Sequence, residues 1–313
     1  MTKESNAKKK PSVAVIGAGR LGQALAIALK SCAYPIVALV AQHRRKAEEA
    51  AAVVGKSGSR PRALAASQLA ELPASDLILI ATPDDAIEQT AERLSKLFGS
   101  ENRATALHTS GALSSEVLNS LRAGGFETGS IHPLVSISEP AAGAEALRGA
   151  FYCLEGTRKA KTMAASLVRD LGGSSFTIKP ENKALYHAAA VMASPHLVSL
   201  FDLATELLAA CGLSRRQSQE VLAPLLQSTV NNLKTSNPQR ALTGTFARGD
   251  VATVRRHLEA LSGKELAEAL EVYKLLGLHS LKLAEKNSLD PQLSDQIRKL
   301  LKSVNLQENL VAD

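Results

Sequence analysis

SVAVIGAGRLG, residues 12–22, decides the fold of this 313-residue chain. A short apolar strand pattern runs directly into the spacing G-x-G-x-x-G, and a helical pattern follows over residues 21–30. In a dinucleotide-binding unit Gly17 permits the tight turn, Gly19 lets the backbone approach a pyrophosphate, and Gly22 lets the helix pack closely on the sheet. The N–H groups at the helix start would face the phosphates. The alternative is a purely structural glycine turn. We expect the dinucleotide to contact Gly17, Ala18, Gly19, Arg20, Leu21 and Gly22.

The second predicted strand, 36–41, ends without the acidic residue that holds the ribose hydroxyls of NAD. That acid is expected about 20 residues beyond the glycines, but the chain reads QHRRK over residues 42–46 and has no acid before Glu48. The guanidinium groups of Arg44 and Arg45 suit a 2′-phosphate, which they can bind by charge-assisted, paired hydrogen bonds. The other interpretation is a solvated basic start of the next helix. The sequence therefore predicts NADP as the cofactor.

Length and cysteine usage indicate a soluble protein of two domains, each long enough to bury its own core. The three cysteines are widely spaced and form no metal or redox pattern, so we expect a reducing compartment and no metal site. No apolar run approaches the roughly 20 residues of a membrane span, and the start MTKESNAKKKP lacks an apolar signal core. We expect a cytoplasmic protein without membrane contact and a disordered basic tail at residues 1–10.

The charge and the aromatic content argue against nucleic-acid binding. The net charge is +7, tryptophan is absent and aromatic residues make up 3% of the chain. A single-strand binding surface needs aromatic side chains among its basic residues, and these are lacking. The excess positive charge is better suited to attract an anionic cofactor or a small anionic substrate.

Strand and helix patterns alternate up to about residue 179, as in a doubly wound parallel sheet. Almost every later segment reads as helix, and Pro195 should kink or split the first of these helices. We therefore predict an α/β fold with an NADP-binding Rossmann domain over residues 11–179, followed by an all-α domain over 180–313 for substrate binding and dimerisation. Further strands are expected at 62–64, 77–81, 104–109, 127–132, 151–155 and 175–178, and later helices at 183–211, 214–233, 251–261, 264–286 and 291–304.

Polar residues follow several predicted strands, at the sheet edge where doubly wound folds bind ligands. Thr82 and Pro83 follow one strand and are expected at the cofactor. Ser110 lies in a Ser-Gly turn and could orient a substrate or the nicotinamide amide; capping of the next helix is the alternative. His132 ends another strand before Pro133, and its near-neutral ordinary pKa suits proton transfer, although a lone histidine is often structural.

Lys183 and His187 stand four residues apart, so one helix face presents both, with Tyr186 beside them. A lysine near a partly buried imidazole can form a proton-transfer pair, and Tyr186 is expected to contact the substrate. The alternative is a lysine that reaches the surface along its apolar stem and a histidine satisfied within the core.

ALTGTFARGD at residues 241–250, with the VATV that follows and His257-Leu258, resembles the Rossmann-like proteins that carry domain-of-unknown-function family 2520. These are relatives of the 6-phosphogluconate dehydrogenase-like oxidoreductases. TPDDAI at 82–87, HTSG at 108–111, HPL at 132–134 and KALYHAA at 183–189 resemble the family as well. The resemblance implies a Rossmann domain, a helical second domain and a homodimer, but no particular substrate.

Two motifs of broader relatives are similar to stretches of this chain. His132 with its proline looks like the His-Pro of prephenate dehydrogenases, whose histidine contacts the reacting hydroxyl. Lys183 and His187 resemble the Lys-x-x-x-Asn of hydroxyacid and ketopantoate enzymes, with histidine in place of asparagine. The resemblance thus favours His132 and Lys183 as catalytic residues.

The second half of the chain departs from the family pattern at two positions. Thr245 stands where the family has proline, and Pro195 where it has asparagine. Arg248 lies in a glycine-bearing loop that is either structural or anion-binding, and we expect it to bind the substrate together with Thr243.

Three functional hypotheses follow. The first is an NADP-dependent oxidoreductase that acts on a small anionic carbonyl, hydroxyl or imine compound. The second is a non-catalytic NADP-binding sensor or interaction module, and the third a deazaflavin-dependent NADP oxidoreductase. The titratable set favours an enzyme, because mere binding does not need paired titratable groups. It comprises Ser110, His132, Lys183 and His187. A homodimer is expected on the helical domain, which has more apolar positions than a small bundle buries.

Overall fold

The computed structural model describes residues 9–56, 58–98 and 104–303, and its contacts divide the chain into two compact units. We call Met1–Ser194 the sheet unit and Pro195–Asp313 the helical unit. The division falls after helix α7 (Lys183–Ala193), later than the predicted boundary at residue 179, because the side chain of Lys183 is buried in the sheet unit. Residues 1–8 of the predicted tail and Val304 lie outside the described residues.

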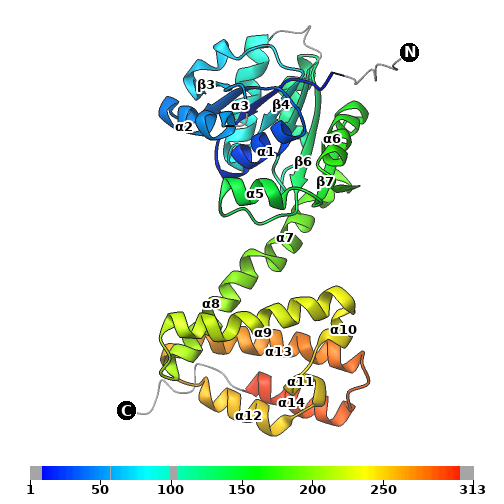
Figure 1. Ribbon diagram of the computed structural model, residues 1–313. Coiled ribbons are helices and arrows are strands. Elements are labelled where there is room, and N and C mark those ends of the chain that lie inside the picture. The colour runs from blue at the N-terminus through cyan, green and yellow to red at the C-terminus, as the bar shows by residue number, and fades with distance from the viewer. Residues whose placement is uncertain (1–8, 57, 99–103, 304–313) are drawn as a thin grey trace, which may run out of the picture. The chain divides into compact units, whose positions relative to one another are not determined.

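An eight-stranded sheet forms the centre of the sheet unit, in the order β3-β2-β1-β4-β5-β6-β7-β8 (Figure 1). The first six strands are parallel, which confirms the predicted doubly wound sheet. Strand β7 runs antiparallel to β6, a reversal that the strand patterns did not predict. The strands are β1 (Val13–Ile16), β2 (Ile36–Ala41), β3 (Arg62–Ala65), β4 (Leu77–Ile80), β5 (Thr105–His108), β6 (Glu127–Pro133), β7 (Phe151–Gly156) and β8 (Ser174–Thr177).

Helices cover both faces of this sheet, so its central strands are apolar throughout. In β1, Val13 and Val15 enter one core and Ala14 and Ile16 the other. The first core is closed by α1 (Arg20–Ser31), α2 (Arg44–Gly55), α5 (Pro140–Ala146) and α6 (Arg158–Asp170). The second is closed by η1 (Ala66–Glu71), α3 (Asp84–Phe98), η2 (Ser115–Leu118) and α4 (Asn119–Ala123). The unit ends with η3 (Pro180–Asn182) and α7.

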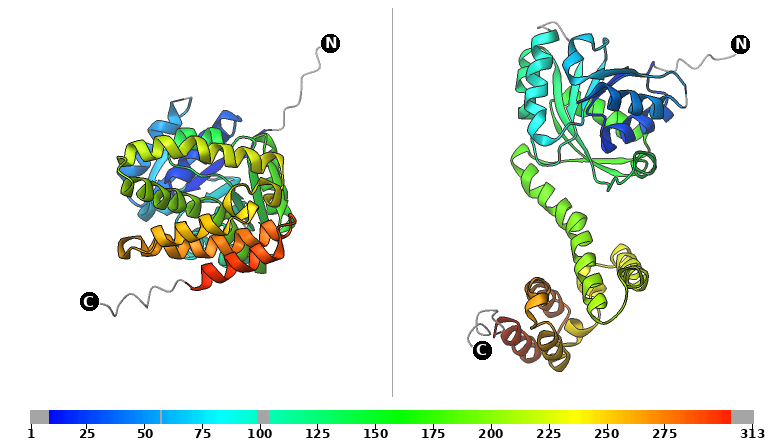
Figure 2. Two further views of the ribbon diagram at one scale, coloured as in Figure 1. Left: turned by 90° about the horizontal axis from the view of Figure 1, so that it is seen from below. Right: turned by 90° about the vertical axis from the view of Figure 1, so that its left-hand side faces the viewer.

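The helical unit contains only helices among its described residues, as predicted (Figure 2). The predicted long first helix is split: Ser194 has φ −129° and ψ −76°, and α8 begins at Pro195. Val254, Leu281 and Ile297 are fully buried and join three helices in one core. The helices are α8 (Pro195–Ala210), α9 (Arg215–Thr235), α10 (Pro238–Ala241), α11 (Thr245–Arg248), α12 (Val251–Ala260), η4 (Lys264–Leu266), α13 (Ala267–Glu285) and α14 (Pro291–Ser303).

The expectation that no segment approaches the length of a membrane span is wrong by length and composition. The helical stretch Pro180–Ala210 has a mean hydropathy of 1.3, and 6% of its most apolar window is buried. The reason is that α7 and α8 follow one another with few charges. Their exposed side chains include Leu185, Met192 and Val198, at 75%, 70% and 68% exposure. These helices therefore carry an apolar surface that the described part of the chain leaves uncovered.

Candidate active site

The glycine turn between β1 and α1 has the geometry that a dinucleotide requires. Gly17 has φ +105°, and a Cβ there would lie 2.4 Å from the backbone of Ala81. A Cβ on Gly22 would lie 2.0 Å from the Gly17 carbonyl oxygen, so helix and turn are in direct contact. At Gly19, by contrast, a Cβ would meet nothing within 4 Å, and this residue caps α1 without a side-chain hydrogen bond. The open space at Gly19 thus lies beside the free N–H groups of a helix start, as a pyrophosphate needs.

Two glycine substitutions should separate folding from cofactor binding. Gly22→Ala should destabilise the protein by at least about 1–3 kcal/mol, because the methyl group meets backbone. Gly19→Ala should change the free energy of unfolding by less than about 0.5 kcal/mol, since its methyl group meets no protein atom. It should nevertheless weaken binding of NADPH about tenfold, the equivalent of one hydrogen bond to a charged group. Urea unfolding and calorimetric titration measure both; equal affinities in Gly19→Ala and wild type would contradict the assignment.

Thr82 follows β4 beside this turn. Its Oγ1 is buried without a hydrogen-bond partner among the described residues. Unpaired buried hydroxyls are rare in native proteins and usually have an explanation such as a missing ligand or water. The orphaned hydroxyl supports the prediction that Thr82 and Pro83 adjoin a cofactor.

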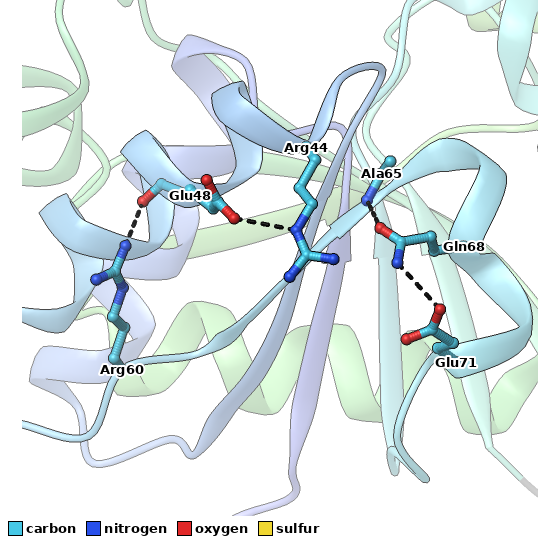
Figure 3. Close-up of polar contacts among 6 residues, drawn as sticks. All are labelled: Arg44, Glu48, Arg60, Ala65, Gln68 and Glu71. Carbon is cyan, nitrogen blue, oxygen red and sulfur yellow. Dashed lines mark hydrogen bonds and ion pairs between the residues drawn. The ribbon is translucent and has the colours of Figure 1, made fainter.

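The predicted 2′-phosphate residues lie at the start of α2. Arg44 Nε donates to Glu48 Oε1 at 3.0 Å, and Arg45 Nε lies 3.3 Å from Glu49 Oε1. Figure 3 shows the Arg44 side chain between Glu48 and the end of β3, with its two terminal nitrogens unpaired in that view. Both arginine side chains are exposed, at 61% and 83%. They are available to an anion, and Arg44 is the one held in place by a short contact.

The predicted catalytic residues of the sheet unit come together at the carboxyl edge of the sheet. Ser110 follows β5, His132 lies near the end of β6, and α7 brings Lys183, Tyr186 and His187 to the same place. The strand register aligns Ile16 of β1 with Ile80, His108 and Ser130 of the following strands, so the glycine turn opens at this edge too.

His132 is the centre of this cluster. Its Nδ1 lies 2.6 Å from the hydroxyl oxygen of Tyr186, and its ring stands edge-on to Tyr186 and to His187, with centroids 5.6 and 5.7 Å away. Cys153 lies opposite His132 in the β6–β7 register, and burial raises the pKa of its thiol. Burial, with the nearby charges of Lys183 and His187, lowers the pKa of His132 to about 4. His132 is therefore a neutral imidazole at pH 7, not the near-neutral titrating group that its ordinary pKa predicts.

The turn residue Gly111 packs against both imidazole rings, those of His132 and His187. A Cβ on Gly111 would lie 2.8 Å from Nε2 of His132 and 2.5 Å from Cδ2 of His187. A Cβ at this position would force at least one of the two rings to shift, and the Nε2 side of His132 adjoins this turn.

Ser110 is engaged in the protein rather than free for a ligand. Its hydroxyl donates to Asp84 Oδ2 at 2.7 Å and accepts the N–H groups of Ala112 and Leu113 at 3.1 and 3.0 Å. One donor and both acceptor positions of the hydroxyl are thus filled. This geometry favours the capping alternative over a direct contact between the Ser110 hydroxyl and the substrate.

Lys183 is buried, with 1% of its surface exposed. Its Nζ donates to the carbonyl oxygen of Ser110 at 3.0 Å and to Ser130 Oγ at 3.2 Å. Burial lowers the pKa of Lys183, while Cys153, Glu155 and Asp84 act in the opposite direction. The surface-seeking lysine does not fit this position, and the role of Lys183 in catalysis stays a prediction.

Sequence reasoning missed two buried groups at this edge. His108 accepts the N–H of Ser110 at Nδ1 and pairs with the carbonyl oxygen of Ser114 through Nε2. Burial, then the charge of Lys183, lowers its pKa to about 3. Glu155 accepts the N–H and hydroxyl of Ser115 at 2.6 and 2.7 Å. Glu155 lies inside β7 and carries no signal in the sequence beyond a polar residue in an apolar strand. His108 ends β5 and opens the HTSG stretch, but that stretch did not single it out as a site residue.

The two neutral histidines predict a specific loss of stability in acid. Their folded pKa values, about 3 for His108 and about 4 for His132, lie below the ordinary 6.5. Between the folded and the ordinary pKa values, the unfolded chain binds more protons than the folded one. The free energy of unfolding therefore has its full value above pH 6.5 and falls as the pH drops toward 4. Each histidine contributes up to about 1.4 kcal/mol per pH unit. Urea unfolding at pH 7 and pH 5 measures this; His108→Asn should reduce the difference, and a difference unchanged by that variant would contradict the assignment.

Thr243 and Arg248 belong to the helical unit. Thr243 precedes α11 and Arg248 ends it, before Gly249 at φ +66°. Arg248 also lowers the pKa of Asp250, after the hydrogen bonds from Thr253 that make Asp250 the cap of α12. Their role at the substrate stays a prediction.

A cavity of about 1130 Å³ lies at the opposite edge of the sheet. It is lined by Asp76, Thr105 and Glu127, which stand at the amino ends of β4, β5 and β6. Volume alone therefore does not locate the site, because ligands of doubly wound sheets bind at the carboxyl ends.

The fold places this protein in the doubly wound, Rossmann-like class, with a helical second unit. Residues 2–133 match the Rossmann-like domain, and residues 150–280 match DUF2520, a domain of unknown function. The chain therefore carries a Rossmann-like domain followed by DUF2520. No curated protein matches it.

Solved structures share this fold over nearly the whole chain. A Bacteroides fragilis protein provisionally named an NADP oxidoreductase has a TM-score of 0.70 at 21% identity, covering 88% of this chain and 99% of its own. A Thermotoga maritima protein has 0.61 at 24%, covering 92% and 98%. Pyrroline carboxylate reductase of Plasmodium falciparum, whose structure holds NADP, has 0.57 at 12%, covering 93% and 98%. At these identities the likeness is one of fold.

Proposed function

We propose that this chain is an NADP-dependent oxidoreductase that transfers a hydride between nicotinamide and a small anionic carbonyl, hydroxyl or imine compound. One observation carries the proposal: the glycine turn and the His132 cluster open at the same edge of one sheet. Relatives in fold named as an NADP oxidoreductase and a pyrroline carboxylate reductase support it. Nicotinamide, when bound, supplies or accepts the hydride.

In this proposal, His132 forms the hydrogen bond to the reacting oxygen or nitrogen of the substrate. Because its Nδ1 is paired with Tyr186, Nε2 is the ring nitrogen left for a substrate, which would approach it beside the Gly111 turn. Burial raises the pKa of Tyr186, so its hydroxyl stays protonated, and we assign this hydroxyl as the donor to an unprotonated Nδ1 of His132. His132 then presents a neutral N–H at Nε2, which polarises an oxygen without carrying a full charge.

The preference for an anionic substrate rests on the whole chain rather than on this edge. Lys183 is a buried cation here, but the carboxylates of Asp84 and Glu155 lie beside it. The net charge of +7 supports an anionic ligand. Arg44 and Arg45 supply the cations for the 2′-phosphate of NADP.

The test is a screen for oxidation of NADPH over a panel of 2-keto acids, aldehydes and imines. We expect a 2-keto acid or another anionic member to be consumed by the wild type and not by His132→Asn. The sensor hypothesis predicts binding of NADPH with no consumption of any panel member and no effect of His132→Asn. No specific observation in the described residues favours that hypothesis or a deazaflavin partner.

We also propose that the protein is a homodimer. The occupant that fits the exposed apolar residues of α8 is a second copy of this chain, since two other helices of the helical unit carry exposed apolar residues as well. These residues are Val221, Leu225 and Leu233 of α9 and Leu275 and Leu276 of α13.

Light scattering at micromolar concentration should give twice the mass of 33.0 kDa. Val198→Asp with Leu225→Asp should shift the mass toward the monomer, because an unpaired charge at a buried interface costs several kcal/mol. Asp substitutions at exposed Lys179 and Arg216 serve as the control. A monomeric wild type would contradict the proposal.

A further inference from the structure

Lys183 is a buried ammonium group whose hydrogen bonds go to neutral acceptors. Burying an ammonium group costs several kcal/mol unless counter-charges repay it. Nearby charges of Cys153, Glu155 and Asp84 raise the pKa of Lys183 against the larger effect of burial, but no ion pair among the described residues includes it. Its two hydrogen bonds go to the carbonyl oxygen of Ser110 and the hydroxyl of Ser130. A neutral side chain of similar length would fill the same space at lower cost.

The two acceptors show what the ammonium group joins. Ser110 begins the turn after β5, and Ser130 lies in β6, two residues before His132. The next residue of the turn, Gly111, packs against His132 and His187 with no room for a Cβ. Any shift of this turn relative to β6 therefore moves both imidazoles.

We propose that Lys183 is a positioning residue that does not touch the substrate: its ammonium group ties the Ser110–Gly111 turn to β6, and the turn sets the place of His132 and His187. The effect of these hydrogen bonds on catalysis rests on the proposed oxidoreductase function. The hydrogen bonds themselves do not depend on that proposal, because they exist in the protein without cofactor or substrate.

The same ammonium group also acts through space. The groups that face His132 are His108 of β5, Cys153 of β7, and Lys183, Tyr186 and His187 of α7. Burial is the main cause of the low pKa of His132, and the charge of Lys183 comes next. A neutral residue at position 183 should therefore let His132 take up a proton at higher pH.

Lys183→Met in the full-length protein tests the tie with two NMR measurements. The pKa of His132, followed through its ring signals, should rise from about 4 toward the ordinary value. The amides of Ala112 and Leu113, which bond to Ser110, should exchange with solvent about five- to tenfold faster, since a lost hydrogen bond is worth about 1 kcal/mol. Lys179→Met removes an exposed lysine nearby and should change neither quantity.

Ser130→Ala distinguishes the hydrogen bond of Lys183 to β6 from the effect of its positive charge on His132. This test does not require the Lys183→Met variant to fold. It removes one acceptor and keeps the ammonium group, so the amides of Ala112 and Leu113 should exchange faster while the pKa of His132 stays near 4. Unchanged exchange in both variants, or an unchanged pKa of His132 in Lys183→Met, overturns the inference. Failure of the proposed function would be seen elsewhere, as a wild type that turns over no member of the NADPH panel.

Discussion

His132→Asn should lower turnover about 10²–10⁴-fold and leave the affinity for NADP nearly unchanged, once a substrate is in hand. The imidazole lies between Tyr186 and Gly111 at the edge where the glycine turn opens, and it is the described side chain best placed to meet the reacting oxygen or nitrogen. Asparagine keeps a polar group of similar size but cannot present Nε2. Steady-state kinetics with NADPH and calorimetric titration of NADP measure the two effects.

Tyr186→Phe is the matched control for this prediction. It removes the single hydroxyl that pairs with Nδ1 and leaves the imidazole in place. We expect an intermediate loss of turnover, because the ring stays but its tautomer is no longer fixed. If His132→Asn turned over normally, the role would pass to His187, since Lys183 is buried beneath the turn.

The double variant Arg44→Ala/Arg45→Ala should abolish the preference for NADP over NAD. Hydrogen bonds to charged groups are worth about 1.5–3 kcal/mol each, so the affinity for NADP should fall at least about tenfold while that for NAD stays constant. Both side chains are exposed at the start of α2, and no acid stands between β2 and Glu48 to hold ribose hydroxyls.

Arg60→Ala is the control for the loss of a nearby positive charge that is not assigned to the 2′-phosphate. Arg60 is an exposed arginine nearby, and its guanidinium is occupied by the backbone carbonyl of Glu48 (Figure 3). Its removal should leave the ratio of the two affinities unchanged. A preference for NADP that survives the double variant, or one that Arg60→Ala removes equally, would contradict the assignment.

The parallel part of the fold was predictable because its signals are local. A strand buried on both faces reads as an apolar run, and turn and capping residues mark its ends. No local feature of the sequence marks β7 as antiparallel, since the pattern of its residues would suit a parallel strand equally well. Helix α5 (PAAGAEA) has an internal glycine, and α10 and α11 have four residues each, too few for a periodicity to show.

The site was predictable for residues at or just after the carboxyl ends of the parallel strands, and not for residues that β7 brings to it. His132 and the Ser110 turn follow from the rule that ligands meet the carboxyl ends of strands. Cys153 and Glu155 reach the same place only through the antiparallel register of β7 on β6. The burial of Lys183 was hidden for a related reason: a lysine at the start of a helix normally reaches solvent, and only the packing of α7 on β6 encloses it.

A crystal structure of the protein with NADP bound tests the central claim most directly. The claim is that a dinucleotide bound at the glycine turn brings its nicotinamide to the His132 cluster. We predict the pyrophosphate at Gly19, the 2′-phosphate at Arg44, and the nicotinamide ring in contact with the Ser110–Gly111 turn, open toward Nε2 of His132. A nicotinamide ring lying away from His132, or no dinucleotide at saturating concentration, would contradict it.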